Sequence, residues 1–155
     1  MLKLNQISVL VRETLRRMDV PEPSIAKLIR GTFAIESNLE ILFTSRLYGL
    51  ALMSDVEAQA MHKEILKFNR SFRDRIKRAT NVDMESLGYK DFTFLLSSNI
   101  AFMVAVLYVY YSVTYKEIPQ DNIDDIARTY AKFYAKSDDP TMIEEFKTSY
   151  DKHFL

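Results

Sequence analysis

Glu36 is the residue of this sequence whose surroundings point to chemistry. It lies in the segment LIRGTFAIESNLEIL, residues 28–42, whose apolar residues recur at helical spacing. Glu36 follows Ile29 by seven residues and Thr32 by four, so a helix places its carboxylate on the core-facing side. Burial disfavours the ionised form, so a carboxyl group held there keeps its proton to a higher pH. Such a group can give a proton to the leaving oxygen of a glycoside.

The same carboxylate also has a purely structural interpretation. Glu36 can mark a helix end where its side chain reaches water, or it can pair with Arg30 or Arg46. Two other carboxylates stand nearby in sequence, Glu40 one helical turn later and Asp55 at the expected start of another helix. Neither is placed as a nucleophile, so the sequence predicts one acid rather than a catalytic pair.

Composition and helix signals predict an all-α protein with a single domain over residues 1–155. Hydrophobic residues make up 48% of the chain, and only three Gly and four Pro occur, which suits a compact helical core. Strand signals are weak because the sequence has no Asn-Gly or Asp-Gly hairpin turn. Cysteine is absent and the two histidines, His62 and His153, are far apart in sequence, so we expect neither a metal site nor a cofactor.

Capping residues and prolines divide the chain into about six expected helices with short connections. The first is expected at about residues 4–18, because the prolines of DVPEPS forbid its continuation. The next carries Glu36 near its C-terminal end, followed by an irregular link that contains Gly49. The residues expected to cap or start helices are Ser24, Ser54 with Glu57 as a capping box, Pro119 with Asp121, and Pro140.

The longest apolar run is FTFLLSSNIAFMVAVLYVYYSVTY, residues 92–115, which contains no charged residue. Its length would allow it to span a membrane, but Ser97, Ser98 and Asn99 interrupt it and no basic clusters flank it. We therefore expect residues 92–113 to form a buried central helix, and we expect no integral membrane protein and no signal peptide. Its tyrosines can pack in the core or line a sugar groove, and packing is the preferred interpretation.

Basic residues are concentrated in the first half of the chain. Residues 1–80 carry 14 Lys and Arg against 9 Asp and Glu, whereas residues 81–155 carry 7 against 12. The densest stretch is KEILKFNRSFRDRIKR, residues 63–78, but no nucleic-acid-binding motif accompanies it. Ile65 and Phe72 give it an apolar side, so we interpret it as a solvated amphipathic helix without a specific nucleic-acid partner. A weaker alternative is attraction to an anionic polymer or an acidic protein.

The order of three segments resembles lysozyme-like muralytic proteins, including the soluble lytic transglycosylase group and small lysozyme-like proteins of tailed bacteriophages. GTFAIESNLEIL resembles their Ala-x-Glu-Ser signature, and YGLALMSD takes the place of a Gly-Leu-x-Gln-Met segment. KEIPQDNIDDIARTYAKFYAKSDDPTMIEEFKTSY follows their C-terminal layout, so the resemblance covers residues 25–152. It implies a lysozyme-like fold with Glu36 as the catalytic acid, and substrate contacts from Ser37, Tyr48 and Tyr134. It also implies a transglycosylase-like route, in which the substrate's own hydroxyl or acetamido group completes the reaction.

The chain also departs from the pattern of that family. Leu52 stands where the family has the Gln of its second motif, and Leu52 cannot hydrogen-bond a sugar. After Tyr134, Ala135 and Lys136 replace a polar pair, and SDDPT replaces a glycine-rich stretch. Preorganised polar groups supply much of the rate of such enzymes, so these changes weaken the expected site.

Two functions therefore stay open from the sequence. The first is a phage virion-associated protein that cleaves peptidoglycan with Glu36 as general acid. The second is a catalytically degenerate structural component of a phage tail, baseplate or neck that keeps the fold. Expected partners are peptidoglycan and other virion proteins, and the expected location is the virion at the host cell wall during entry, or the host cytoplasm before assembly. A third alternative, an unrelated helical binding protein, requires the motif order to be coincidence.

Overall fold

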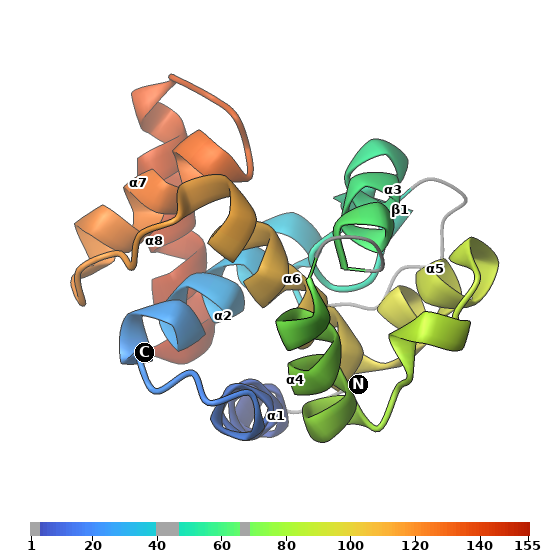
Figure 1. Ribbon diagram of the computed structural model, residues 1–155. Coiled ribbons are helices and arrows are strands. Elements are labelled where there is room, and N and C mark those ends of the chain that lie inside the picture. The colour runs from blue at the N-terminus through green and yellow to red at the C-terminus, as the bar shows by residue number, and fades with distance from the viewer. Residues whose placement is uncertain (1–3, 40–46, 66–68) are drawn as a thin grey trace.

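The charge-free run around residue 100 forms the centre of the fold, and the other helices surround it (Figure 1). The computed structural model describes residues 4–39, 47–65 and 69–155. In these ranges the chain forms eight α-helices, one short 3₁₀ helix and one hairpin within a single compact, mostly helical domain. The elements are α1 (Leu4–Arg17), α2 (Pro23–Ser37), β1 (Leu47–Tyr48), β2 (Met53–Ser54), α3 (Asp55–Lys63), α4 (Arg70–Thr80), η2 (Met84–Ser86), α5 (Tyr89–Ser98), α6 (Ile100–Tyr115), α7 (Ile123–Phe133) and α8 (Pro140–Phe154). The expectation of about six helices was too low.

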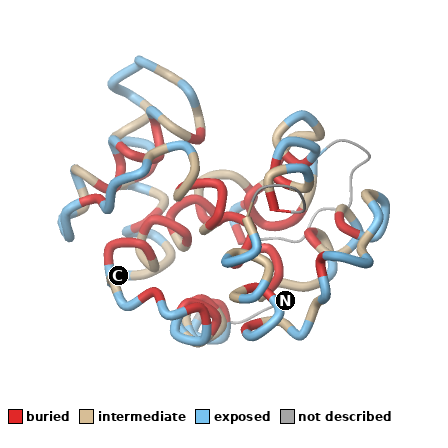
Figure 2. The backbone as a smooth tube through the Cα atoms, in the orientation of Figure 1, coloured by how far each residue is buried: buried red, intermediate tan, exposed pale blue. Residues whose placement is uncertain are grey.

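Helix α6 is buried on almost every side. Nine of its residues, between Phe102 and Tyr111, are buried, and it contacts α1, α2, α3, α4, α5 and α7. Figure 2 shows the buried residues concentrated along this central helix and on the inward sides of its neighbours. Burying each large apolar side chain contributes about 1.5–3 kcal/mol relative to exposure, so the buried residues of α6 stabilise the core substantially. The predicted buried central helix is confirmed for this part of the run.

The prediction of one continuous helix over residues 92–113 was wrong. The chain bends by 111° between α5 and α6, and Asn99 lies at the break in an extended conformation. The side-chain oxygen of Asn99 accepts a hydrogen bond from the backbone N–H of Phe102 at 3.0 Å, which caps α6. An Asn can therefore start a second helix inside an apolar run, and α5 leaves the core at that point.

Within the described residues, no single helix is both long enough and apolar enough to cross a membrane. Helices α5 and α6 meet those criteria only when taken together, across their sharp bend.

The link between α2 and α3 contains a short antiparallel hairpin that the sequence analysis missed. Leu47 pairs with Ser54 and Tyr48 with Met53, and the turn between them begins at Gly49. Gly49 has a φ of 70°, and a Cβ added there would lie 2.2 Å from the carbonyl oxygen of Leu96. Two-residue strands are too short to produce an alternating pattern, which is why periodicity did not reveal them.

Helix α2 packs against α7 and α8, and Gly31 lies directly against the ring of Phe146 in α8. A Cβ at Gly31 would lie 2.0 Å from the ring of Phe146, which is fully buried. The helix begins at Pro23 with Glu22 before it, so the expected cap at Ser24 was wrong; Ser24 is buried in the first turn. Pro at the first helical position needs no N–H partner, and the cap and the helix start lie two residues earlier than expected.

The remaining helix starts follow the sequence signals closely. The expected capping box of α3 is present, because Ser54 accepts the N–H of Glu57 at 3.2 Å. Helix α7 is capped by Asn122 rather than by the expected Asp121, and α8 starts at Pro140 as predicted. Helix α1 ends at Arg17, within one residue of the prediction. Local hydrogen bonding controls these boundaries, which is why sequence alone finds most of them.

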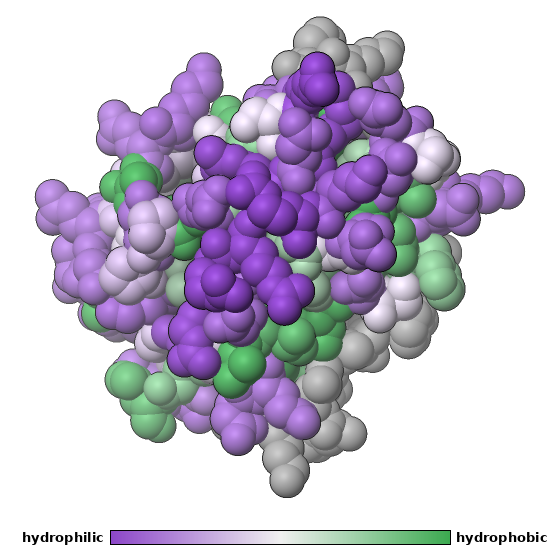
Figure 3. Space-filling view, turned by 60° about the horizontal axis from the view of Figure 1, so that its bottom comes forward, coloured by the Kyte–Doolittle hydropathy of each residue, from purple (hydrophilic) through white to green (hydrophobic). Residues whose placement is uncertain are grey.

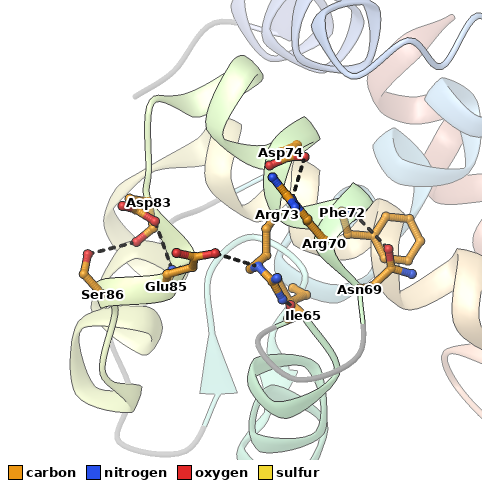
Figure 4. A network of polar contacts seen from close by, with 9 residues as sticks. All are labelled: Ile65, Asn69, Arg70, Phe72, Arg73, Asp74, Asp83, Glu85 and Ser86. Carbon is orange, nitrogen blue, oxygen red and sulfur yellow. Dashed lines mark hydrogen bonds and ion pairs between the residues drawn. The ribbon is translucent and has the colours of Figure 1, made fainter.

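The basic stretch 63–78 is not one amphipathic helix as expected. Its described parts are the end of α3 and the helix α4, and Asn69 caps α4 by accepting the N–H of Phe72 at 3.2 Å. Arg73 of α4 contacts two neighbouring segments (Figure 4). Its guanidinium donates a hydrogen bond to the carbonyl oxygen of Ile65 at 3.0 Å and forms an ion pair with Glu85 at 3.6 Å. The face that carries α1 and α4 is mainly hydrophilic (Figure 3).

Replacing Gly49 with Ala should destabilise the protein. The left-handed φ costs about 1–2 kcal/mol for a residue with a Cβ, and the clash with Leu96 adds overpacking of about 1–3 kcal/mol. Gly88→Ala is the matched control, because Gly88 has a φ of −71° and no atom would lie within 4 Å of the new Cβ. Urea unfolding should show a clearly larger loss for Gly49→Ala than for Gly88→Ala, whose only expected cost is the weaker preference for Ala at the N-cap of α5. Equal losses in the two variants would contradict this account of the hairpin.

Replacing Asn99 with Ala should remove the cap of α6 and cost about 0.5–2 kcal/mol of unfolding free energy. Ser98→Ala is the control, since the exposed Ser98 hydroxyl only donates back to the carbonyl oxygen of Phe94 within α5. Thermal melts followed by circular dichroism compare the two variants. A stable Asn99→Ala protein with higher helix content would instead mean that the bend does not depend on the cap.

Candidate functional site

Glu36 lies in the last turn of α2, and its side chain is half-buried against α7. The hydroxyl of Tyr130 donates a hydrogen bond to Oε1 of Glu36 at 2.6 Å. The two residues are 94 positions apart in sequence, so the packing of α2 on α7 creates this contact. The expected partial burial of Glu36 is confirmed.

Burial raises the pKa of Glu36 above its ordinary value. The hydrogen bond from Tyr130 favours the ionised form and opposes that rise, while the negative charge of Glu57 adds to it. Among the described residues no cation pairs with Glu36, and Arg30 donates instead to the hydroxyl of Tyr150 at 2.9 Å. Arg46, the other expected partner, lies outside the described residues. The structural interpretation of Glu36 as half of an ion pair with Arg30 was therefore wrong.

Tyr130 belongs to a cluster of four tyrosines from α6 and the C-terminal end of α7. The ring of Tyr134 is at the centre, with ring centroids 5.3 Å from Tyr110, 6.0 Å from Tyr111 and 5.9 Å from Tyr130. Burial raises the pKa of all four hydroxyls, so they stay protonated and act as donors at neutral pH. The preferred interpretation of Tyr110 and Tyr111 as core residues is confirmed, because both are buried.

The hydroxyls of these tyrosines have partners within the protein. Tyr111 shares a hydrogen bond of 2.7 Å with Thr32, and Tyr110 donates to the carbonyl oxygen of Phe133 at 2.7 Å. Tyr134 donates to the carbonyl oxygen of Ala51 in the hairpin turn. Because buried polar groups are costly when unpaired, this network ties α2, the hairpin and α7 together around Glu36.

The structure brings two of the three expected substrate residues close to Glu36, but in buried positions. Ser37 follows it directly, is buried, and donates to the carbonyl oxygen of Phe33 at 3.0 Å. Tyr134 is buried in the tyrosine cluster. Tyr48 lies on β1, half-buried, and its hydroxyl donates to Asp55 at 3.2 Å. Substrate binding by these three residues stays a prediction.

Asp55 and Glu40 were the second carboxylates considered from the sequence. Asp55 is the first residue of α3 and accepts hydrogen bonds from Tyr48 and Tyr89, which agrees with its interpretation as a helix N-terminal residue. Glu40 lies outside the described residues.

Glu57 is a second carboxylate near Glu36 that the sequence analysis did not select. Its side chain is only 16% exposed, and its closest ion-pair partner is Lys136 at 3.8 Å. Burial raises the pKa of Glu57, whereas Lys136 and hydrogen bonds from Ser54 lower it. The spacing of Ser54 and Glu57 already explained Glu57 as part of a capping box. Nothing else in the sequence indicated that it lies near Glu36.

A cavity lined by tyrosines lies apart from Glu36, which is not among its lining residues. It has a volume of about 300 Å³ between α4, α6 and the turn after α1, and Tyr108, Tyr111 and Tyr115 line it with Arg75. The expected position of Glu36 in or beside a cleft stays a prediction.

Comparison of the chain with protein-family models, with curated proteins and with solved structures finds no match. The described residues contain no group of three or more His, Asp or Glu side chains placed to hold a metal ion.

Replacing Tyr130 with Phe should raise the pKa of Glu36 further, because the hydrogen bond that favours the ionised carboxylate is lost. Tyr150→Phe is the matched control: it also removes a hydroxyl from a ring next to Phe146, but that hydroxyl is bonded to Arg30. Titration of the Glu36 side-chain carboxyl carbon by NMR measures the effect. An equal shift in both variants would show that repacking, rather than the hydrogen bond, controls the value.

Proposed function

We propose that this chain is a phage virion-associated, peptidoglycan-cleaving protein with a lysozyme-like fold, in which Glu36 is the general acid. The observation that carries the proposal is the setting of Glu36: half-buried, with a raised pKa and no cation beside it among the described residues. Glycoside cleavage needs a carboxyl group that is still protonated when substrate binds, and burial is the usual way to obtain one.

The arrangement of the resembling segments supports the proposal. The Glu-Ser pair ends α2, the Gly-Leu segment forms the hairpin, and the Tyr-rich segment forms the end of α7. Two hydrogen bonds join them, from Tyr130 to Glu36 and from Tyr134 to Ala51. Segments whose order alone suggested a lytic family thus meet around the carboxyl group that the proposal uses.

In the proposed reaction, Glu36 donates its proton to the glycosidic oxygen as the bond from that oxygen to the anomeric carbon breaks. The electron pair of that bond leaves with the oxygen, and positive charge develops on the sugar ring. A hydroxyl oxygen of the same sugar then forms the new bond to the anomeric carbon and passes its proton to the Glu36 carboxylate, which restores the acid. If the acetamido oxygen forms that bond instead, the positive charge passes to the acetamido group until water attacks the anomeric carbon and gives its proton to Glu36. Neither route needs a second protein nucleophile. The reaction would act on the host cell wall during phage entry, with the protein carried in the virion beside tail or baseplate proteins.

A second candidate function is a catalytically degenerate structural component of a phage tail, baseplate or neck. One observation favours it: two residues expected to bind substrate make hydrogen bonds within the protein instead. The hydroxyls of Ser37 and Tyr134 donate to main-chain carbonyl oxygens. Leu52, in the hairpin turn, offers no polar atom where the family has Gln. A protein that keeps this fold for assembly would retain the hydrogen bonds and lose the substrate contacts.

Replacing Glu36 with Gln separates the two functions. If Glu36 is the general acid, the variant keeps a similar shape but has no proton to donate, so cell-wall clearing should fall by about 10²–10⁴-fold. The assay follows the turbidity of purified peptidoglycan with wild type and variant at equal concentration. Undiminished clearing by the variant would refute Glu36 as the acid, and inert wild type would favour the structural function.

The folding control for this variant is its thermal stability as a function of pH. A raised pKa means that the folded state binds the Glu36 proton more tightly, so this contribution to stability is lost as pH rises through the folded pKa. Gln cannot ionise, so the variant should melt at the same or a higher temperature than wild type at pH 7. Loss of clearing together with a lower melting temperature would indicate misfolding instead of lost catalysis.

A further inference from the structure

Three basic side chains line one cavity between α1, the turn after it and the first half of α2. The two helices lie side by side (Figure 1), and the cavity between them has a volume of about 310 Å³. Arg12 comes from α1, and Lys27 and Arg30 come from α2. Glu22 is the one carboxylate among the described residues that line it. Positive charge is therefore in excess in this cavity.

Arg30 is half-buried and forms no ion pair with the described part of the chain. Its guanidinium carbon lies 5.3 Å from the ring centroid of Phe154, and one guanidinium nitrogen donates to the hydroxyl of Tyr150 at 2.9 Å. These contacts with α8 hold the side chain in one position. Its Nε is buried and donates to no described residue. A poorly solvated cation with an unused donor is costly unless an anion accompanies it.

The other positive groups at the cavity are also weakly compensated. Lys27 pairs with Asp121 at 2.7 Å, but the two side chains are 36% and 46% exposed, so the pair holds Lys27 only weakly. Arg12 is exposed and forms no ion pair within the described ranges. Helix α2 begins here without an acidic residue in its first turn, and Glu22 makes no side-chain hydrogen bond to it. The partial positive charge of that helix end adds to the charge of the three cations.

We propose that this cavity binds the phosphate group of a small molecule. A phosphate monoester carries close to two negative charges and three acceptor oxygens, which matches three separate cations better than the single charge of a carboxylate does. The planar guanidinium of Arg30 can bind two of those oxygens at once. Leu15 and Val20 are buried and line the same cavity, so they offer an apolar surface to the rest of the molecule. Glu36 does not line this cavity, and the inference does not depend on the proposed function.

The test is an NMR titration of the backbone amides of the full chain with inorganic phosphate at neutral pH. Amide signals of the lining residues should shift until they saturate with phosphate. Sodium chloride at the same ionic strength should not produce these shifts, and acetate should bind more weakly. Equal shifts with chloride would mean ionic screening and would overturn the proposal, as would acetate binding as tight as that of phosphate.

Arg12→Gln tests the cavity without disturbing the core, because Arg12 is exposed. The variant should bind phosphate about 2–5-fold more weakly, as expected for an exposed charge pair. Arg17→Gln is the matched control: it removes the same charge from an exposed position of the same helix, and Arg17 does not line the cavity. Equal weakening in both variants would reduce the effect to net charge and overturn the site.

Arg30→Gln should weaken phosphate binding by about tenfold or more, since hydrogen bonds to charged groups are the stronger ones. This variant also loses the contacts with α8, so Glu22→Gln provides a test that does not risk the fold. Glu22 makes no side-chain cap, and its removal takes away the carboxylate that repels the ligand. Phosphate binding should become about 2–5-fold tighter in Glu22→Gln. Unchanged or weaker binding in a folded Glu22→Gln protein would overturn the proposal.

A phosphate group can belong to a free molecule or to a lipid headgroup, and two probes distinguish these sources. Glycerol 3-phosphate should bind the full chain at least as tightly as inorganic phosphate and shift the same amide signals. Phosphatidic acid in phosphatidylcholine vesicles presents the same group on a surface. Sedimentation with these vesicles without binding of glycerol 3-phosphate would assign the cavity to a lipid surface and overturn the small-molecule ligand.

Discussion

The structure depends on covering the charge-free helix α6 on almost every side. Six other helices contact it, and each must present an apolar face at the correct distance. The requirement reaches the loops as well, since the hairpin turn at Gly49 passes so close to Leu96 that no side chain fits there. One end of α6 carries Tyr110 and Tyr111, whose buried hydroxyls need partners. The polar cluster next to Glu36 provides the hydrogen-bond partners that these hydroxyls need inside an apolar core.

The site therefore combines two physical requirements that oppose each other. Apolar packing removes water from Glu36 and Glu57 and disfavours their charges. The hydroxyl of Tyr130 hydrogen-bonds Glu36 without adding a cation, and burial outweighs this bond, so the pKa of Glu36 stays raised. Lys136 is placed beside only one of the two carboxylates. Holding two carboxylates in poorly solvated positions costs stability, because burial disfavours the ionised form of each.

Local features of the fold were predicted well from the sequence, and longer-range ones less well. The start of α8 at Pro140 and the capping box of Ser54 with Glu57 depend on residues within one helical turn. Asn99 is also a local cap, but the apolar residues on both sides of it concealed the bend. The hairpin was missed because two-residue strands leave no periodic pattern.

By itself, the sequence determined the helical class, the central apolar segment and the half-buried position of Glu36, because helical periodicity places residues on a face without reference to distant parts of the chain. Only the tertiary structure decided what surrounds that carboxylate. Tyr130 is 94 residues away in sequence, and Glu57 reaches the cluster from a different helix. A pKa is set by burial and by charges within a few ångströms, and the packing of helices decides which charges those are.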